Sequence, residues 1–329
     1  MTDVLIWTGP VSAAMLDPLA DVPTERQREL RSMFATSTSS ADFRKESEAT
    51  TSTHAKAALV ARANEIDDGL KCSSVAPLVL TFNTWTLKTY NQPYKNDPKR
   101  IGSQAFGEWA NTLGSDPLTA LAGPDATRIV MAGFSAAHGA HEVILGKVAL
   151  RKDPRLVGLY AADSYYSAWG VQTPKPGHRA WLRMAIEYGL PAWFSTSTRH
   201  PAAHPSATES FLIMANSLGM LPVDYDKELS GNDVPDPRSV RKQGSVMWFE
   251  YGDSLQHPEH ATKLAPIALS KGPFVRVSPQ PLNRISPQGI VATAPAPAPN
   301  TQSGSNAGRN ILLGLTAIGL GWVMYKATS

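Results

Sequence analysis

The chain alternates between short apolar runs and longer segments whose apolar residues recur at helical spacing. Runs that are apolar at nearly every position are typical of strands buried on both faces, as in a parallel sheet. The runs are APLVLTF (76–82), RIVMAGF (128–134), LVGLYAA (156–162), PAWFSTS (191–197) and SVMWFEY (245–251). Helices are expected between them, at about 102–113, 136–148, 179–189 and 207–219. This alternation predicts an α/β fold with a doubly wound, mostly parallel sheet in a domain over residues 76–280.

Residues 1–75 show a different pattern and are predicted to form an N-terminal extension that is partly disordered. Residues 4–7 (VLIW) suit one short strand, while residues 24–34 and 54–68 have the apolar spacing of helices. Residues 35–52 are rich in Ser, Thr and charge and contain almost no large apolar side chain. Because such a segment buries little apolar surface to offset the entropy of ordering, it is expected to be flexible.

Composition and charge narrow the range of partners. The 329 residues are 42% apolar and 18% charged, with a formal net charge of +3. The sequence has no Lys/Arg-rich run with interleaved aromatic residues, so no nucleic-acid partner is expected. Cys72 is the single cysteine, which excludes an intrachain disulfide and predicts a plain structural or surface thiol.

The segment RIVMAGFSAAHGAHEVILGK carries the most informative motif. Apolar residues lead into Gly133-Phe134-Ser135-Ala136-Ala137, and a predicted helix follows. The pattern G-x-S-x-G between a strand and a helix is a nucleophile elbow, in which a strained backbone lifts the serine hydroxyl clear of the sheet. Small neighbours are needed because strand and helix come close together, and Gly133 and Ala137 occupy those positions. The alternative is that Ser135 is an ordinary turn serine.

A nucleophilic serine needs a general base, and the base needs an orienting acid. Asp163 directly follows the run 156–162, whereas the loop STRHPAAHPS after 191–197 contains no carboxylate. Glu209 is the alternative acid, although it is expected one turn into a helix. The run 245–251 leads into GDSLQHPEH, which offers His257 and His260 as candidate bases.

Residues 76–270 resemble the α/β-hydrolase superfamily, in which the chain order is serine, acid, histidine. The resemblance implies a serine hydrolase that cleaves an ester or related acyl bond of a small molecule or polymer. It implies Ser135 as nucleophile, Asp163 as acid and His257 as base, with His260 as the alternative base. No metal or cofactor is implied. His138 and His141 stand three apart, but HGAHE matches no metal motif, so packing or surface roles are expected.

The same resemblance implies an oxyanion hole built from two backbone N–H groups. One would come from Ala136, and the other from the loop after the first core strand, at Asn83 and Thr84. Many relatives carry His-Gly in that loop, so this sequence departs from the pattern, and the Asn83 side chain could donate instead.

Aromatic residues gather in the loops after the predicted core strands, which line the binding crevice of open α/β sheets. Trp85, Tyr165 and Tyr166 are the candidates to line the substrate, and they would suit an apolar or aromatic acyl group. Simple packing of the loops is the equal alternative.

The C-terminal part differs from the rest. Residues 281–309 are rich in Pro, Ala, Ser and Gln and are predicted to be a linker. Residues 310–326 are predicted to be a hydrophobic helix that anchors the chain in a membrane, through the uncharged run 311–325. That run spans about 22 Å, so snorkelling flanks or local thinning would be needed in a hydrocarbon core of roughly 30 Å.

The sequence leaves two interpretations of the function open, and within the first it leaves two interpretations of the location. The first is a membrane-associated serine hydrolase with its catalytic domain on the cytoplasmic side, since the N-terminus does not resemble a secretory signal. A soluble cytoplasmic protein with a docked C-terminal helix is the alternative, and equal partitioning of full-length protein and a form without 305–329 would favour it. The second reading is a non-catalytic binding or scaffold protein, or a structural protein of a virion or envelope, that keeps the hydrolase fold.

Overall fold

The computed structural model describes residues 2–10, 16–68, 85–91, 102–199, 204–227, 229 and 234–275. The predicted strand at 76–82, Cys72, the linker at 281–309 and the helix at 310–326 lie outside the described residues. Within the ranges just given, no helix is long and apolar enough to cross a membrane. Membrane attachment through 311–325 therefore stays a prediction from sequence.

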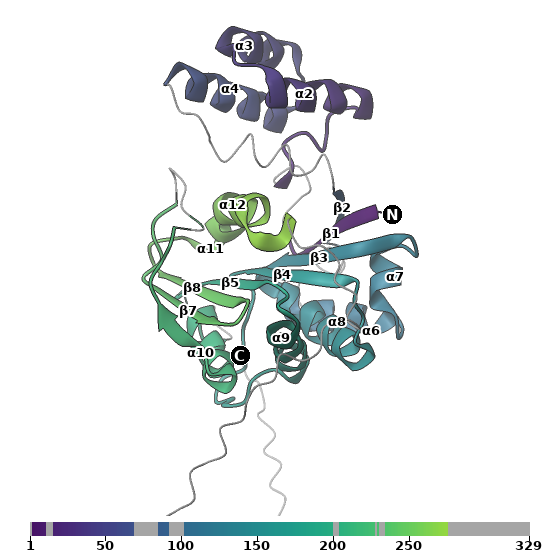
Figure 1. The fold of residues 1–329 in the computed structure, drawn as a ribbon, viewed down its shortest axis with the longest axis vertical. Coiled ribbons are helices and arrows are strands. Elements are labelled where there is room, and N and C mark those ends of the chain that lie inside the picture. Colours follow the sequence, from purple (N-terminus) through teal and green to yellow (C-terminus); the bar gives the residue numbers. More distant parts are fainter. Residues whose placement is uncertain are drawn as a thin grey trace, which may run out of the picture. The chain divides into compact units, whose positions relative to one another are not determined.

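The core is one eight-stranded sheet with the order β2-β1-β3-β4-β5-β8-β7-β6 (Figure 1). All pairs from β2 to β8 are parallel, and β7 and β6 add two antiparallel strands at one edge. The strands are β1 (Thr2–Thr8), β2 (Thr86–Tyr90), β3 (Ala126–Phe134), β4 (Leu156–Ala162), β5 (Ala192–Ser197), β6 (Leu221–Val223), β7 (Ser239–Gln243) and β8 (Val246–Gly252). The mostly parallel sheet is the predicted one, and four of the five predicted core strands are confirmed as β3, β4, β5 and β8.

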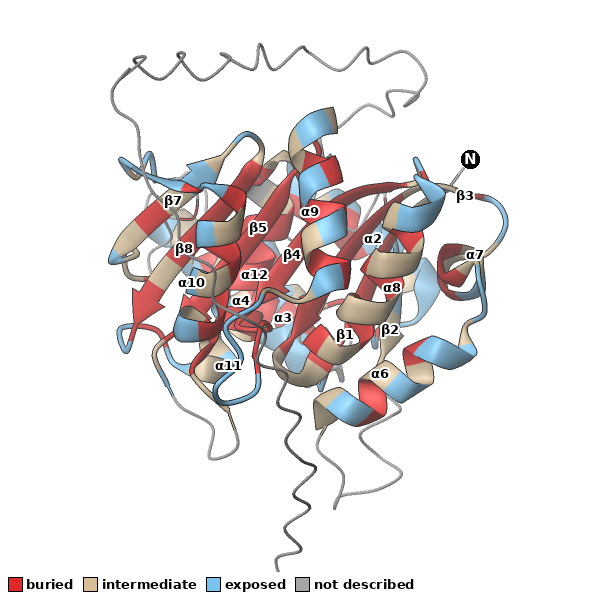
Figure 2. Cartoon of the chain, turned by 90° about the horizontal axis from the view of Figure 1, so that it is seen from below, coloured by how far each residue is buried: buried red, intermediate tan, exposed pale blue. Residues whose placement is uncertain are grey.

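Helices cover both faces of the sheet. One face carries α6 (Gly102–Thr112), α7 (Pro117–Ala122), α8 (His138–Arg151), α9 (Pro176–Tyr188) and α10 (Ala207–Leu218), and the other carries α11 (His257–Glu259) and α12 (Ala265–Lys271) (Figure 1). Successive residues of β3 alternate between the two resulting cores, with Ile129 and Met131 on one side and Val130 and Ala132 on the other. Buried residues fill the central strands and the helix faces turned toward them (Figure 2). The predicted helices at 102–113, 136–148, 179–189 and 207–219 are confirmed.

The predicted boundary at residue 76 is wrong for the first strand. β1 lies between β2 and β3, and Val4, Leu5, Ile6 and Trp7 are all buried in the two cores. A four-residue apolar run predicts a strand, but its partner β3 begins more than a hundred residues later. Pattern alone therefore could not assign it to the sheet.

The predicted disorder at 35–52 is also wrong, because α3 (Ser40–Ala49) forms there. Ser39 caps this helix by accepting a hydrogen bond from Asp42 N, and Phe43 packs edge-on against Phe34 at 5.2 Å between ring centroids. The helices α2 (Thr24–Thr36) and α4 (Thr53–Asp67), both predicted, share this small core with α3. One well-placed phenylalanine and a capping serine thus order a segment that its composition marks as polar.

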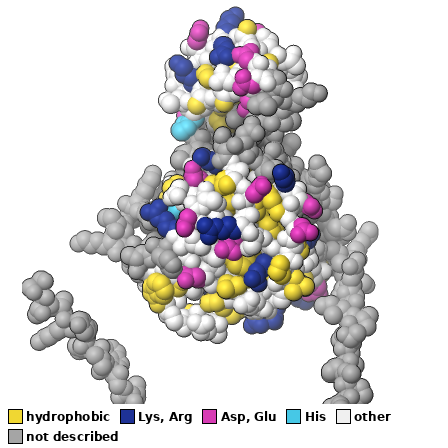
Figure 3. All heavy atoms as spheres, turned by 90° about the vertical axis from the view of Figure 1, so that its left-hand side faces the viewer, with side chains coloured by type: hydrophobic (Ala, Val, Ile, Leu, Met, Phe, Trp, Pro, Cys, Tyr) yellow, Lys and Arg dark blue, Asp and Glu magenta, His cyan; other side chains and the backbone are white. Residues whose placement is uncertain are grey.

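Parallel strands bring their carboxyl ends to one edge of the sheet. In the register of this sheet Thr8 pairs with Gly133, Phe134 with Ala162, and Ala162 with Ser195. The residues that follow β1, β3, β4, β5 and β8 therefore meet at this edge. On the face shown in Figure 3, the described Lys/Arg and Asp/Glu side chains are interspersed, and neither sign gathers into a patch there.

Candidate active site

Ser135 directly follows β3 and has a φ of 56°, in the left-handed region that non-glycine residues seldom adopt. The chain then enters a short 3-10 turn, Ser135–Ala137, and α8. A Cβ at Gly133 would lie 2.6 Å from the His141 ring and 2.7 Å from the Ala137 Cβ. Only glycine fits at 133, while the small Ala137 is accommodated opposite it. The local geometry is that of a nucleophile elbow.

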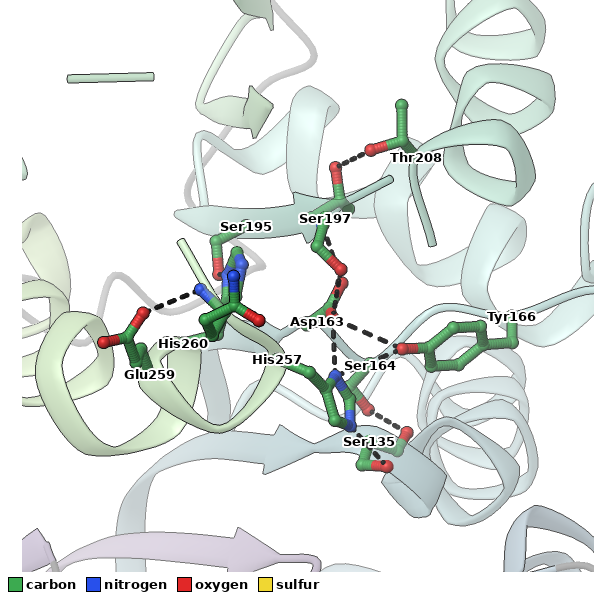
Figure 4. Close-up of polar contacts among 12 residues, drawn as sticks. Ser135, Asp163, Ser164, Tyr166, Ser195, Ser197, Thr208, His257, Glu259 and His260 are labelled. Carbon is green, nitrogen blue, oxygen red and sulfur yellow. Dashed lines mark hydrogen bonds and ion pairs between the residues drawn. The ribbon is translucent and has the colours of Figure 1, made fainter. Parts of the chain in front are cut away.

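His257 lies beside this serine, with its Nε2 atom 3.0 Å from Ser135 Oγ (Figure 4). It opens α11, whose first turn is fixed by a reciprocal capping box between Gln256 and Glu259. The imidazole packs against the Phe134 ring, with centroids 4.5 Å apart, and its side chain is 25% exposed. The imidazole is therefore held in place and still reachable from solvent.

Asp163 follows β4 and is fully buried, with its Oδ2 atom 2.6 Å from His257 Nδ1. The end of β5 supplies two further hydrogen bonds, from Ser197 N to Oδ1 at 2.8 Å and from Ser197 Oγ to Oδ2 at 2.7 Å. Burial opposes the charge of Asp163, but the hydrogen bond from His257, the nearby imidazoles and the Ser197 hydroxyl outweigh it and lower its pKa. An ionised Asp163 can only accept, so His257 donates from Nδ1 and leaves Nε2 free to accept from Ser135.

Tyr166, predicted to line the substrate, contacts the acid instead. Its hydroxyl donates to Asp163 Oδ2 at 3.3 Å and lies 3.4 Å from His257 Nδ1. Burial, followed by the charge of Asp163, raises the pKa of Tyr166, so the phenol stays protonated and acts as a donor. Neither Ser197 nor Tyr166 was identified as a partner of Asp163 from sequence. The only signal for Ser197 was the loop after β5, which lacks a carboxylate.

The alternative residues for base and acid lie elsewhere. His260 bonds through Nδ1 to Ser195 Oγ at 3.0 Å and is fully buried. Burial lowers the pKa of His260 to about 4. Glu209 caps α10 by accepting from Ser206 N and Ser206 Oγ, both at 2.9 Å.

The structure corrects two predictions about substrate-lining residues. Tyr165 belongs to the core, where its hydroxyl accepts from Lys175 N at 3.1 Å and its ring meets Phe211 edge-on. Trp85 precedes β2, so it lies at the amino end of the parallel strands, with the Arg128 guanidinium over its ring. Ser135 lies at the opposite, carboxyl end. The error arose because the sequence placed Trp85 in the loop after a strand at 76–82, whereas this residue directly precedes the strand β2.

Ala136, predicted for the first half of the oxyanion hole, follows Ser135 in the 3-10 turn. Asn83 and Thr84, predicted for the second half, lie outside the described residues. Gly9, directly after β1, lies beside the elbow, since a Cβ on it would lie 2.7 Å from Phe134 O. The signal in the sequence was the Thr-Gly-Pro that follows VLIW.

The two histidines of α8 form hydrogen-bond contacts with the elbow and with the buried end of β1. His138 bonds through Nδ1 to the Ser135 carbonyl oxygen at 3.1 Å, and His141 Nε2 lies 2.8 Å from Thr8 Oγ1. In the described part of the chain, no three His, Cys, Asp or Glu side chains are grouped so that they could hold a metal ion.

Comparison with known proteins gives a distant structural likeness. No family model matches the chain, and no curated protein matches it. A CE15 glucuronoyl esterase from Teredinibacter turnerae T7901 is similar at 12% identity over 81% of this chain and 66% of that chain, with a TM-score of 0.31. A glucuronoyl esterase from Solibacter usitatus is similar at 12% identity over 82% of this chain and 74% of that one, with a TM-score of 0.35. The chain thus spans just under two thirds of the length of the first of these structures.

Proposed function

We propose that the chain is a serine hydrolase that cleaves a carboxylic ester or a related acyl bond. One observation carries the proposal: the His257 ring bridges Ser135 Oγ at 3.0 Å and Asp163 Oδ2 at 2.6 Å. A serine, an imidazole and a buried carboxylate in this order form the constellation that activates a hydroxyl for acyl transfer.

In the proposed reaction, Ser135 Oγ attacks the acyl carbon while His257 Nε2 takes the hydroxyl proton. Asp163 keeps the Nδ1–H tautomer of His257 and stabilises the imidazolium. The carbonyl π electrons move to the oxygen, which the Ala136 N–H stabilises as an oxyanion. Collapse of the intermediate expels the alcohol, which receives the proton from His257. Water then attacks the acyl-serine in the same way, giving the carboxylic acid and free Ser135.

Two features of the site favour catalysis over the non-catalytic binding or scaffold alternative. A left-handed conformation at a non-glycine residue costs of order 1–3 kcal/mol and persists where the surroundings impose it, as they do for Ser135. Burying the carboxylate of Asp163 is costly as well, and three donors from two neighbouring elements hold it in its ionised form. A fold kept only for binding needs neither.

The test is labelling by a fluorophosphonate probe, which requires no knowledge of the substrate. The phosphorus bonds to Ser135 Oγ, fluoride leaves, and His257 takes the proton. We expect labelling of the full chain and none of Ser135→Ala. Ser195→Ala is the matched control, because Ser195 also bonds a histidine but is fully buried, and it should label like the unchanged chain. A chain that fails to label, or labels equally with Ser135→Ala, rejects the proposal.

A further inference from the structure

We propose that His138 and Ser164 are positioning residues that fix the peptide between Ser135 and Ala136 so that its N–H serves the oxyanion. This inference rests on the proposed function. It adds two residues whose side chains hydrogen-bond the Ser135 carbonyl oxygen rather than the general base or the acid. Their role is to hold the backbone unit on which the charge of the tetrahedral intermediate would rest.

The carbonyl oxygen of Ser135 accepts two side-chain hydrogen bonds. Ser164 Oγ donates to it at 3.0 Å, and His138 Nδ1 lies 3.1 Å away (Figure 4 shows the Ser164 bond). A carbonyl oxygen has no proton to give, so His138 carries its proton on Nδ1. Burial, with the nearby Lys175 charge, holds the pKa of His138 well below its ordinary value, so the ring is neutral. Both donors are buried, which protects these bonds from exchange with water.

The peptide bond transmits this restraint to Ala136. Peptide units are planar, and the described part of the chain contains no cis bond, so the Ser135 C=O and the Ala136 N–H point in opposite directions. Fixing the oxygen therefore fixes the direction of the N–H. The restraint matters because Ser135 has a φ of 56°, a conformation that is strained for serine. Two neutral hydrogen bonds to the carbonyl oxygen offset part of that strain.

The two donors come from different parts of the fold, and both bond the same carbonyl oxygen of the elbow. His138 is the first residue of α8, and Ser164 directly follows Asp163 after β4. Asp163 has a φ of 43°, and the two consecutive side chains bond different partners. Asp163 holds His257, while Ser164 holds the elbow carbonyl. One turn thus positions both the base and the candidate oxyanion donor.

The test uses three disrupting variants, Ser164→Ala, His138→Leu and the double variant that carries both changes. They are compared with a fourth variant, His138→Asn. The Asn side-chain amide can place a donor close to the position of His Nδ1, so it should rescue function, whereas Leu removes the donor. The readouts are kcat and KM on an activated p-nitrophenyl ester and the rate constant for fluorophosphonate labelling. Ser167→Ala is the control, because Ser167 lies in the same segment and bonds Ser210 at 3.1 Å, away from the elbow.

Losing a whole oxyanion donor costs about 100- to 1000-fold in kcat, which bounds the effect of misplacing one. We expect about 10-fold lower kcat for each single variant and about 100-fold for the double variant, with KM unchanged and His138→Asn close to the unchanged chain. Equal labelling rates in all variants would overturn the positioning role while leaving the proposed function standing. The same holds if His138→Asn is as slow as His138→Leu. If the unchanged chain does not react at all, both proposals fall.

Discussion

Two histidines that follow β8 each form a hydrogen bond with a serine from another strand end or strand. His257 and His260 stand three residues apart, and each has a ring nitrogen 3.0 Å from a serine hydroxyl. The partner of His257 is Ser135, and the partner of His260 is Ser195. By distance alone the two pairs are equivalent.

Their surroundings separate them. His257 uses Nε2 toward its serine and Nδ1 toward Asp163, and its side chain is 25% exposed. His260 uses Nδ1 toward its serine and is fully buried, and the second contact of that serine is the Tyr160 hydroxyl at 3.1 Å. Ser195 lies inside a regular strand, whereas Ser135 stands in a left-handed turn beyond one. Access, an acid on the far nitrogen and a strained serine are what the proposed reaction requires, and the first pair combines them. The second pair joins β4 and β5 to the helical turn His260–Leu264.

The largest effect that this comparison predicts is on activity, in the pair His257→Gln and His260→Gln. A glutamine at 257 cannot take a proton, so hydrolysis and fluorophosphonate labelling should fall by about 10⁴-fold or more. His260→Gln should keep activity within about tenfold, and it should lower the free energy of unfolding by about 1–3 kcal/mol because the buried Ser195 hydroxyl loses a partner. Ester hydrolysis and urea unfolding of both variants measure this. Equal loss of activity in a folded His260→Gln variant would erase the distinction.

The sequence was sufficient to select Ser135, Asp163 and His257, whose side chains are joined by hydrogen bonds in the structure, because each follows a strongly apolar strand. The signal for an elbow is local, and the missing carboxylate after β5 directed the role of acid to Asp163. The partners that hold this acid, Ser197 and Tyr166, could not be chosen in this way. Each is one of many hydroxyl residues, and only the strand register brings it to Asp163.

The sheet could be predicted as a type but not in its order. β1 is a lone apolar run near the N-terminus, and the described helices α2, α3 and α4 lie in the chain between it and β2, its neighbour at the edge of the sheet. The sequence therefore assigned the oxyanion loop to Asn83 and Thr84, which lie outside the described residues, and gave no role to Gly9, which lies beside the elbow. It also placed Trp85 near the substrate, when that ring lies at the other end of the strands. Chain order does not encode which strands pair across such an insertion.

A second prediction uses the burial of His260 to separate stability from catalysis. Burial lowers the pKa of His260 from 6.5 to about 4 and that of His141 to about 3. Between these values and 6.5 the unfolded chain binds protons that the folded chain does not. The stability that the two neutral rings contribute is therefore complete above pH 6.5 and is lost as the pH falls toward 4.

His260→Gln should reduce the slope of unfolding free energy against pH by up to about 1.4 kcal/mol per unit between pH 6.5 and 4. His54→Gln is the matched control, because it makes the same substitution at an exposed histidine on α4. Urea unfolding across this pH range gives the slope directly. An unchanged slope in His260→Gln would show that this ring exchanges protons as freely in the folded chain as in the unfolded one.

The smallest effect concerns Tyr166, which joins the reactive pair through Asp163. In Tyr166→Phe the carboxylate loses a donor at 3.3 Å and keeps those from Ser197 and His257, so we expect about a fivefold lower kcat, the equivalent of roughly 1 kcal/mol. With fewer donors the pKa of Asp163 rises, the carboxylate holds the proton of its imidazole partner more tightly, and the acid limb of kcat/KM should move to higher pH.

Tyr165→Phe is the natural control, because the neighbouring hydroxyl bonds Lys175 N inside the core and does not reach the acid. It should lower stability slightly and leave the pH profile of hydrolysis unchanged. A shift of the acid limb in Tyr166→Phe alone would show that the phenol acts on the charge of Asp163. Equal losses of activity in both tyrosine variants, with no shift, would reduce Tyr166 to packing. The reactive pair would then owe its difference from the buried pair to Asp163, solvent access and the strained serine alone.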